Sequence, residues 1–124
     1  MKADDDSWPE DSPLRKMNDL ILEAGPKMGR PTDVVQRYKD LMIDAGFTNV
    51  TEIIYKWPSN PWPKDPKFKE LGAWNLVNFD HGLEGMVVAL FTRVLGWPAE
   101  EVTAFLTSVR KNLRDKRMHT YWPM

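Results

Sequence analysis

An apolar stripe at helical spacing predicts a first helix near the start of the chain, with Leu14, Met17, Leu20, Ile21 and Ala24 on its buried face. Ser12 followed by Pro13 is a typical helix start, because a serine side chain caps the first turn and proline fits its first position. Pro26 is expected to end or kink this helix, because proline cannot donate the next backbone hydrogen bond.

A second helix and a strand are predicted to follow. Thr32 is the expected N-cap of that helix, and Gly46 is its expected end. Its expected buried stripe consists of Val34, Val35, Tyr38, Leu41, Met42 and Ala45. Residues 49–57 are rich in β-branched and aromatic side chains, and this composition predicts a strand.

The second half of the chain is predicted to be mostly helical. Prolines in residues 57–66 favour a rigid, extended loop, because proline continues neither helix nor sheet. Helical spacing then runs from Phe68 to Leu95, with a break expected near Gly72. A final helix opens at Pro98, and its expected core stripe is Val102, Phe105, Leu106, Val109 and Leu113. The tail, residues 118–123, is expected to be extended.

The predicted strand has no obvious partner, and an isolated strand leaves its backbone donors and acceptors unpaired. Two interpretations stay open. The chain folds mainly as helices with a minor hairpin involving the tail, or it is a piece of a larger α/β sheet that missing sequence or another chain supplies. The second interpretation accounts for the strand better.

Composition and charge narrow this picture only a little. A chain of 124 residues suits one domain, and a formal net charge of -1 gives no field that would attract nucleic acid. No cysteine is present and the two histidines are far apart, so no metal site is expected. The acidic residues 1–11 are expected to form a disordered or surface segment, and they lack the apolar core of a secretory signal. A cytoplasmic or nuclear location and no membrane association are expected.

Several longer motifs occur in a characteristic order: DSPLRKMNDLILEA, YKDLMIDAGFTNVTEIIYKWP, NPWPKDPKFKELGAWN, LEGMVVALFTRVLGW and AEEVTAFLTSVRKNLRDKRMHTYWP. In this order and spacing they resemble the C-terminal portion of fungal S-adenosylmethionine (SAM)-dependent methyltransferases of the LaeA type. The resemblance extends from about Asp11 to Pro123.

The resemblance implies a part of a class I (Rossmann-like) α/β fold, in which an N-terminal half holds SAM through a glycine-rich turn. Residues 48–57 would then correspond to the sixth strand, and the helices of residues 67–115 to an insertion over the substrate side. The seven glycines never form Gly-x-Gly. We therefore expect a mainly α chain with one or two strands that lacks the cofactor-binding half and does not bind SAM or catalyse methyl transfer alone.

Aromatic residues beside prolines are the candidates for a binding site. We predict that Trp57, Trp62 and Trp122 line a pocket for a flat, hydrophobic small molecule, since aromatic faces provide large contact areas. Asn75 either orients a ligand or caps a helix. By the resemblance, His119 lies near the substrate side, although packing or backbone hydrogen bonding is the simpler role for it.

No catalytic, cofactor-binding or metal-ligating residue is assigned. Asp80 and His81 have the side chains of an acid–base pair, but neighbours on a helix point about 100° apart, so a structural or solvated role is favoured for both. The basic residues at the end of the last helix are explained by the helix dipole, and no nucleic-acid partner is expected; they are Arg110, Lys111, Arg114, Lys116 and Arg117.

The leading hypothesis is a truncated or partial methyltransferase in which residues 12–124 form the substrate-recognition and lid portion. It would serve small-molecule methylation in secondary metabolism, with a protein partner or missing N-terminal half supplying the SAM site. The alternative is a non-catalytic interaction module that pairs with another chain through its open strand and apolar helix. A third hypothesis is a small helical enzyme whose own pocket is built from Asp80, His81 and the tryptophans.

Overall fold

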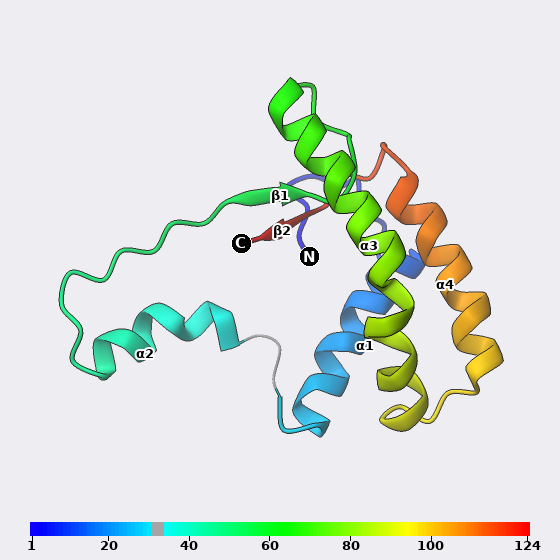
Figure 1. Ribbon diagram of the computed structural model, residues 1–124, viewed down its shortest axis with the longest axis horizontal. Coiled ribbons are helices and arrows are strands. Elements are labelled where there is room, and N and C mark those ends of the chain that lie inside the picture. Colours follow the sequence, from blue (N-terminus) through cyan, green and yellow to red (C-terminus); the bar gives the residue numbers. More distant parts are fainter. Residues whose placement is uncertain (31–33) are drawn as a thin grey trace.

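The computed structural model describes residues 1–30 and 34–124. Three helices pack together: α1 (Pro13–Lys27), α3 (Pro66–Arg93) and α4 (Ala99–Arg114) (Figure 1). Two short strands, β1 (Lys56–Pro58) and β2 (Tyr121–Pro123), pair antiparallel near one end of the bundle. A 3-10 helix η1 (Val34–Arg37) and α2 (Tyr38–Asp44) lie apart from it. The predicted mainly α fold with one or two strands is confirmed.

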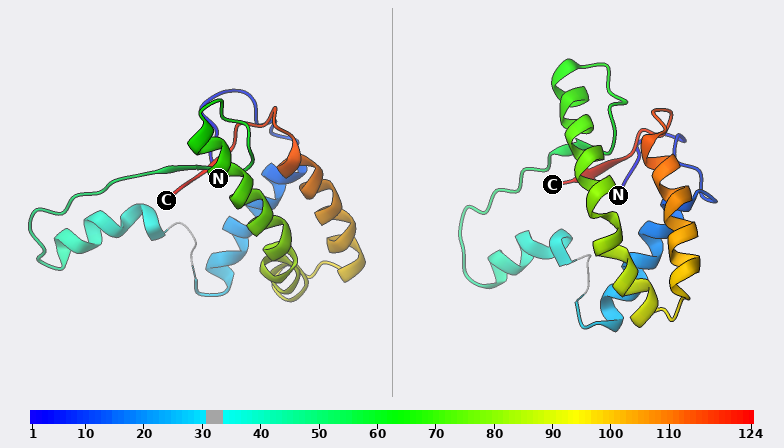
Figure 2. Two further views of the ribbon diagram at one scale, coloured as in Figure 1. Left: turned by 45° about the horizontal axis from the view of Figure 1, so that its top comes forward. Right: turned by 45° about the vertical axis from the view of Figure 1, so that its right-hand side comes forward.

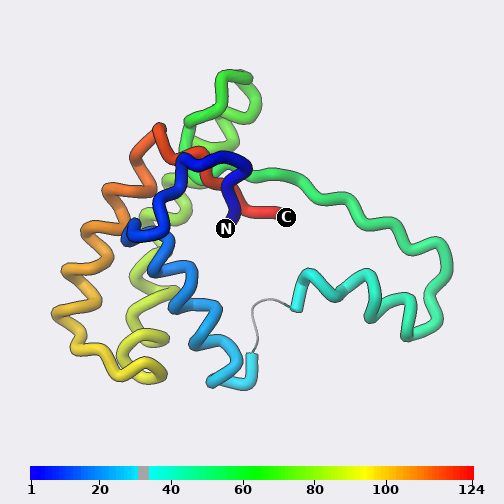
Figure 3. The backbone as a smooth tube through the Cα atoms, turned by 180° about the vertical axis from the view of Figure 1, so that it is seen from behind, coloured from blue at the N-terminus to red at the C-terminus, as the bar shows by residue number. Residues whose placement is uncertain are grey.

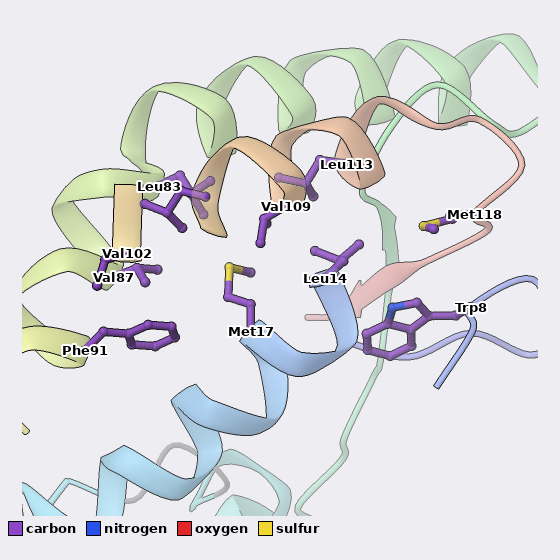
Figure 4. Packing of buried hydrophobic residues seen from close by; sticks show 11 residues of the cluster. Trp8, Leu14, Met17, Leu83, Val87, Phe91, Val102, Val109, Leu113 and Met118 are labelled. Atoms are coloured by element: carbon purple, nitrogen blue, oxygen red, sulfur yellow. The ribbon is translucent and has the colours of Figure 1, made fainter. Parts of the chain in front are cut away.

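The core lies between the three long helices, and each contributes one apolar stripe (Figure 4). α3 contributes Leu83, Val87 and Phe91, and α1 contributes Leu14 and Met17, all of them almost completely buried. The predicted stripe of α4 is confirmed, because Val102, Leu106, Val109 and Leu113 are buried and Phe105 packs against them half-buried. Each such side chain stabilises the fold by roughly 1.5–3 kcal/mol through burial.

The two ends of α1 follow the sequence prediction. The Ser12 hydroxyl accepts a hydrogen bond from the Arg15 backbone N–H at 3.3 Å, which caps the helix. Pro26 lies inside the last turn, and the helix ends one residue later at Lys27. The predicted cap of the following helix, Thr32, lies outside the described residues.

α3 runs unbroken from Pro66 to Arg93, so the predicted break near Gly72 is wrong. Gly72 is buried, and a Cβ atom there would lie 2.2 Å from the Asn60 carbonyl oxygen. The absence of a side chain at Gly72 therefore allows the loop after β1 to approach the helix closely, and the glycine does not interrupt the helix.

The predictions for residues 34–57 need correction. α2 ends at Asp44, and Gly46 follows it with φ 92°, as a helix stop requires. The expected buried stripe is exposed except for Val34, which is half-buried, because η1 is the only described element that α2 contacts. Both further views show α2 and the coil of residues 45–55 lying apart from the three-helix bundle (Figure 2).

The predicted strand at residues 49–57 is also too long. Only Lys56–Pro58 forms a strand, and its partner is the tail, as the first interpretation expected, although α3 and α4 lie between the two strands in the chain. Its neighbour Tyr55 exchanges two backbone hydrogen bonds with Met124, at 2.8 and 2.9 Å. Ile53 and Ile54 are 64% and 61% exposed. A β-rich composition favours a strand, but a strand forms only where a backbone partner is present.

The acidic N-terminal segment, expected to be disordered or on the surface, is tied to the rest of the fold. Lys2 and Tyr121 exchange two backbone hydrogen bonds at 2.9 Å, so the segment runs along the free edge of β2. Trp8 is 6% exposed and packs on the core, because burying its large ring outweighs the polarity of its neighbours. The two ends of the chain consequently lie close together (Figure 3).

Two glycines of α3 provide a test of this packing. We expect Gly72→Ala to lower the free energy of unfolding by about 1–3 kcal/mol, because the new methyl group collides with the Asn60 backbone. Gly85 has no atom within 4 Å of a built Cβ, so Gly85→Ala is expected to raise the same free energy by about 0.5–1 kcal/mol. Urea unfolding of both variants measures the difference, and equal effects would contradict the packing described.

Candidate functional site

A cleft of about 240 Å³ lies where the N-terminal segment, the loop after β1 and the tail meet. Its walls include the rings of Trp62, Phe68, His119 and Tyr121. The charged side chains of three further residues stand among these rings: Asp4, Asp5 and Lys56. A largely aromatic cleft with a few polar groups is the usual form of a small-molecule site.

The loop after β1 positions Trp62. The Ser59 backbone N–H donates to the Thr120 carbonyl oxygen at 3.0 Å, and the Trp62 Nε1–H donates to the same oxygen at 3.0 Å. The centroids of the Trp62 and His119 rings are 4.8 Å apart. These two predicted site residues are therefore neighbours in one cleft, although they are far apart in sequence.

The Asp4 carboxylate joins two walls of the cleft. The Tyr121 hydroxyl donates to it at 2.7 Å, and the Lys56 ammonium donates to its other oxygen. The hydrogen bond from Lys56, followed by that from Tyr121, lowers the pKa of Asp4. The same carboxylate raises the pKa of Tyr121 and of Lys56, because each is stabilised in its protonated form.

The Asp5 carboxylate contacts His119. Asp5 Oδ2 lies 2.7 Å from His119 Nδ1, and the His119 backbone N–H donates to the Ser7 hydroxyl oxygen at 2.9 Å. Hydrogen bonds from Ser7 and then from His119 lower the pKa of Asp5 to about 2. Both the main chain and the ring of His119 are therefore held in place by the N-terminal segment.

A second cleft, of about 280 Å³, lies between α1 and α3. It is lined mainly by apolar side chains, among them Met17, Met86 and Trp122. Trp122 stacks on Phe79 with the ring centroids 4.0 Å apart. The structure thus places Trp122 in a different cleft from Trp62 and His119.

The remaining predicted residues lie outside both clefts. Trp57 sits on β1 opposite Trp122 and is 39% exposed. Asn75 donates its side-chain amide to the Pro58 carbonyl oxygen at 3.0 Å, which ties α3 to β1 instead of capping a helix. The hydrogen bond of Asn75 favours a structural role for that side chain.

The Asp80 and His81 side chains do not form a pair. Asp80 accepts from Arg114 at 2.6 Å and lies 3.3 Å from Arg110, so it links α3 to α4. His81 is an exposed residue of α3. Two residues of the predicted basic cluster therefore hold the helices together.

Sequence reasoning missed Asp4, Asp5 and Lys56 as residues of the first cleft. Asp5 and His119 are 114 positions apart, and no local pattern joins residues at such a distance. One signal was present in the sequence. Trp8 is a large apolar residue within an acidic segment, and it indicates that the segment packs against the fold.

Comparison with known proteins shows that the chain is similar to a portion of several fungal methyltransferases. It is 42% identical over 122 residues to "Probable methyltransferase tdiE" of Emericella nidulans, and the match covers 98% of this chain and 38% of that protein. It is 37% identical over 119 residues to "Methyltransferase pytC" of Aspergillus terreus, with 96% and 37% covered. It is 33% identical over 121 residues to "Secondary metabolism regulator LAE1" of Cochliobolus heterostrophus, with 97% and 39% covered.

This chain is homologous to a portion of the LaeA-like fungal methyltransferases. The portion amounts to about two fifths of the length of these curated relatives. No protein-family model matches the chain, and no solved structure matches it. Within residues 1–30 and 34–124, no helix combines the length and apolar character that a membrane span needs.

LaeA-like methyltransferases use SAM, and the described residues of this chain do not fit that cofactor. A SAM site of this kind needs a glycine-rich turn between a strand and the start of a helix. The positive-φ glycines Gly29, Gly46 and Gly96 instead all follow the ends of helices. The start of α3, which follows β1, is already capped by the Asp65 carboxylate.

The Asp5 contacts predict an acid sensitivity. The folded-state pKa of about 2 lies below the ordinary value of 3.8, so these contacts stabilise the fold fully above about pH 4 and are lost as the pH falls toward 2. Asp5→Asn is expected to reduce the fall in unfolding midpoint across this window. Asp6→Asn, at an exposed neighbouring position, is the control. Thermal unfolding at several pH values measures both, and identical profiles for Asp5→Asn and the unchanged protein would contradict the assignment.

Proposed function

We propose that this chain is the substrate-recognition and lid portion of a SAM-dependent methyltransferase that acts on small molecules in secondary metabolism. The observation that carries the proposal is the similarity to methyltransferases over 98% of the chain. The aromatic cleft supports the recognition role, since it offers ring faces and a few fixed polar groups. The cofactor site belongs to the remaining portion of the enzyme.

The exposed segment of residues 34–55 supports an attachment to that remaining portion. Large apolar side chains of this segment are 41–64% exposed: Val35, Tyr38, Leu41, Met42, Ile43, Phe47, Ile53, Ile54 and Tyr55. Ile53 and Ile54 are adjacent, so in an extended run they face opposite sides. A strand that is apolar on both sides is typical of a sheet covered on both faces, as in α/β folds. We propose that this segment joins the sheet of the cofactor-binding portion.

A chimera tests this proposal. The matched 122 residues of tdiE from Emericella nidulans are replaced by this chain, and SAM binding is measured by calorimetry. The chimera is expected to bind SAM at micromolar concentrations, and this chain alone is expected to give no binding heat. A folded chimera without SAM binding, or micromolar binding by the chain alone, would contradict the proposal.

A double variant tests whether residues 53 and 54 contact the cofactor-binding portion, and Trp74→Lys is its matched control. Ile53→Lys with Ile54→Lys is expected to weaken SAM binding by the chimera at least about tenfold, because charges do not fit a covered sheet. In the isolated chain the same variant is expected to leave the unfolding midpoint unchanged, since both side chains are exposed. Trp74→Lys, at a residue of α3 that is 68% exposed, should leave both properties unchanged.

The second candidate function is a non-catalytic interaction module that pairs with another chain. The same exposed segment favours it, because an extended run without a partner strand and an exposed apolar helix are typical docking features. This function predicts association through residues 34–55, which sedimentation velocity detects at micromolar protein concentration. A monodisperse monomer with one cooperative unfolding transition would exclude it.

A further inference from the structure

The charged groups around the first cleft already have hydrogen-bond partners within the protein. Asp4 binds Lys56 and the Tyr121 hydroxyl, and Asp5 binds His119 and the Ser7 backbone N–H. Each of these charged groups already has a hydrogen-bond partner, so an ionic ligand gains less here than at a charge without a partner. The cleft is therefore suited to an uncharged molecule.

The size and walls of the cleft restrict that molecule further. Its volume of about 240 Å³ lies below the roughly 300–1,000 Å³ of pockets for drug-sized ligands, so it suits one or two fused rings. The rings of Trp62, Phe68 and Tyr121 offer apolar faces, against which a flat aromatic molecule packs best. Prolines at positions 58 and 63 complete the rigid wall.

His119 provides one oriented polar atom. A carboxylate only accepts hydrogen bonds, so the hydrogen between Asp5 and His119 belongs to His119 Nδ1. The Nε2 atom of the neutral ring then carries the free lone pair. The described residues provide no hydrogen-bond partner for this atom. The ring is held beside Trp62, with the centroids 4.8 Å apart.

We propose that this cleft binds an uncharged, flat aromatic molecule of one or two fused rings that carries a hydroxyl or ring N–H group. That group donates to His119 Nε2 while the ring packs against Trp62. Asp5 is the positioning residue that fixes the tautomer. That such a molecule is the methyl acceptor rests on the proposed function, whereas the binding itself does not.

Binding to the full chain tests the proposal, with 2-naphthol as the probe and 2-methoxynaphthalene as the matched ligand that lacks the donor. Titration followed by two-dimensional NMR at pH 8 gives both dissociation constants. 2-Naphthol is expected to bind about 5- to 10-fold more tightly, as one net hydrogen bond allows. The shifted signals are expected to include the Trp62 indole N–H and the His119 ring. Equal affinities, or shifts confined to other parts of the chain, would overturn the proposal.

Variants separate the donor contact from the packing. His119→Phe keeps an aromatic face and is expected to abolish the preference between the two ligands. Trp62→Ala is expected to weaken both ligands alike. His81→Gln, at the exposed second histidine, should change neither. A preference that survives His119→Phe in a folded protein would contradict the assignment. These measurements contain no SAM, so their failure is distinguishable from failure of the methyltransferase proposal in the chimera.

Discussion

The structure depends on the backbone pairing that joins three distant segments of the chain. The tail from Thr120 to Met124 pairs on one side with residues 55–59 and on the other side with Lys2. This pairing brings together the two ends of the segment that contains α3 and α4, and it places the N-terminal segment against the tail. The buried side chains of Ser59 and Thr120 hydrogen-bond at the centre of the junction. The first cleft adjoins this pairing, and Trp62, Pro63 and Phe68, which follow β1 in the chain, complete its walls.

The core and the junction explain which elements the sequence predicts well. α1 and α4 carry their own signals, because a cap, a dipole-matched charge pattern and an apolar stripe are local properties. Gly72 was misinterpreted, since its reason is a loop contact that the local pattern does not contain. The run at residues 49–57 was predicted too long for a related reason. Its side chains favour a strand, but strand formation depends on a partner elsewhere.

In the candidate site, too, the sequence predicts single residues but not the contacts between distant ones. Trp62 was predicted as a candidate from its aromatic ring beside prolines, and His119 from the resemblance to the methyltransferases. Their proximity, and the carboxylate that holds His119, follow from the pairing of the chain ends. Asp80 and His81 have the side chains of an acid–base pair, but their adjacency on a helix already favoured a structural or solvated role. In the folded chain Asp80 serves the contact between α3 and α4 through Arg110 and Arg114.

Amide hydrogen exchange of the full chain tests the central junction most directly. The account predicts strong protection for the backbone N–H groups of Lys2, Ser59 and Tyr121, all of which donate across the junction. It predicts exchange close to that of an unstructured chain for residues 50–54, which lie outside the helices and strands. Rapid exchange at Lys2 and Tyr121, in a protein whose α3 amides stay protected, would contradict the account.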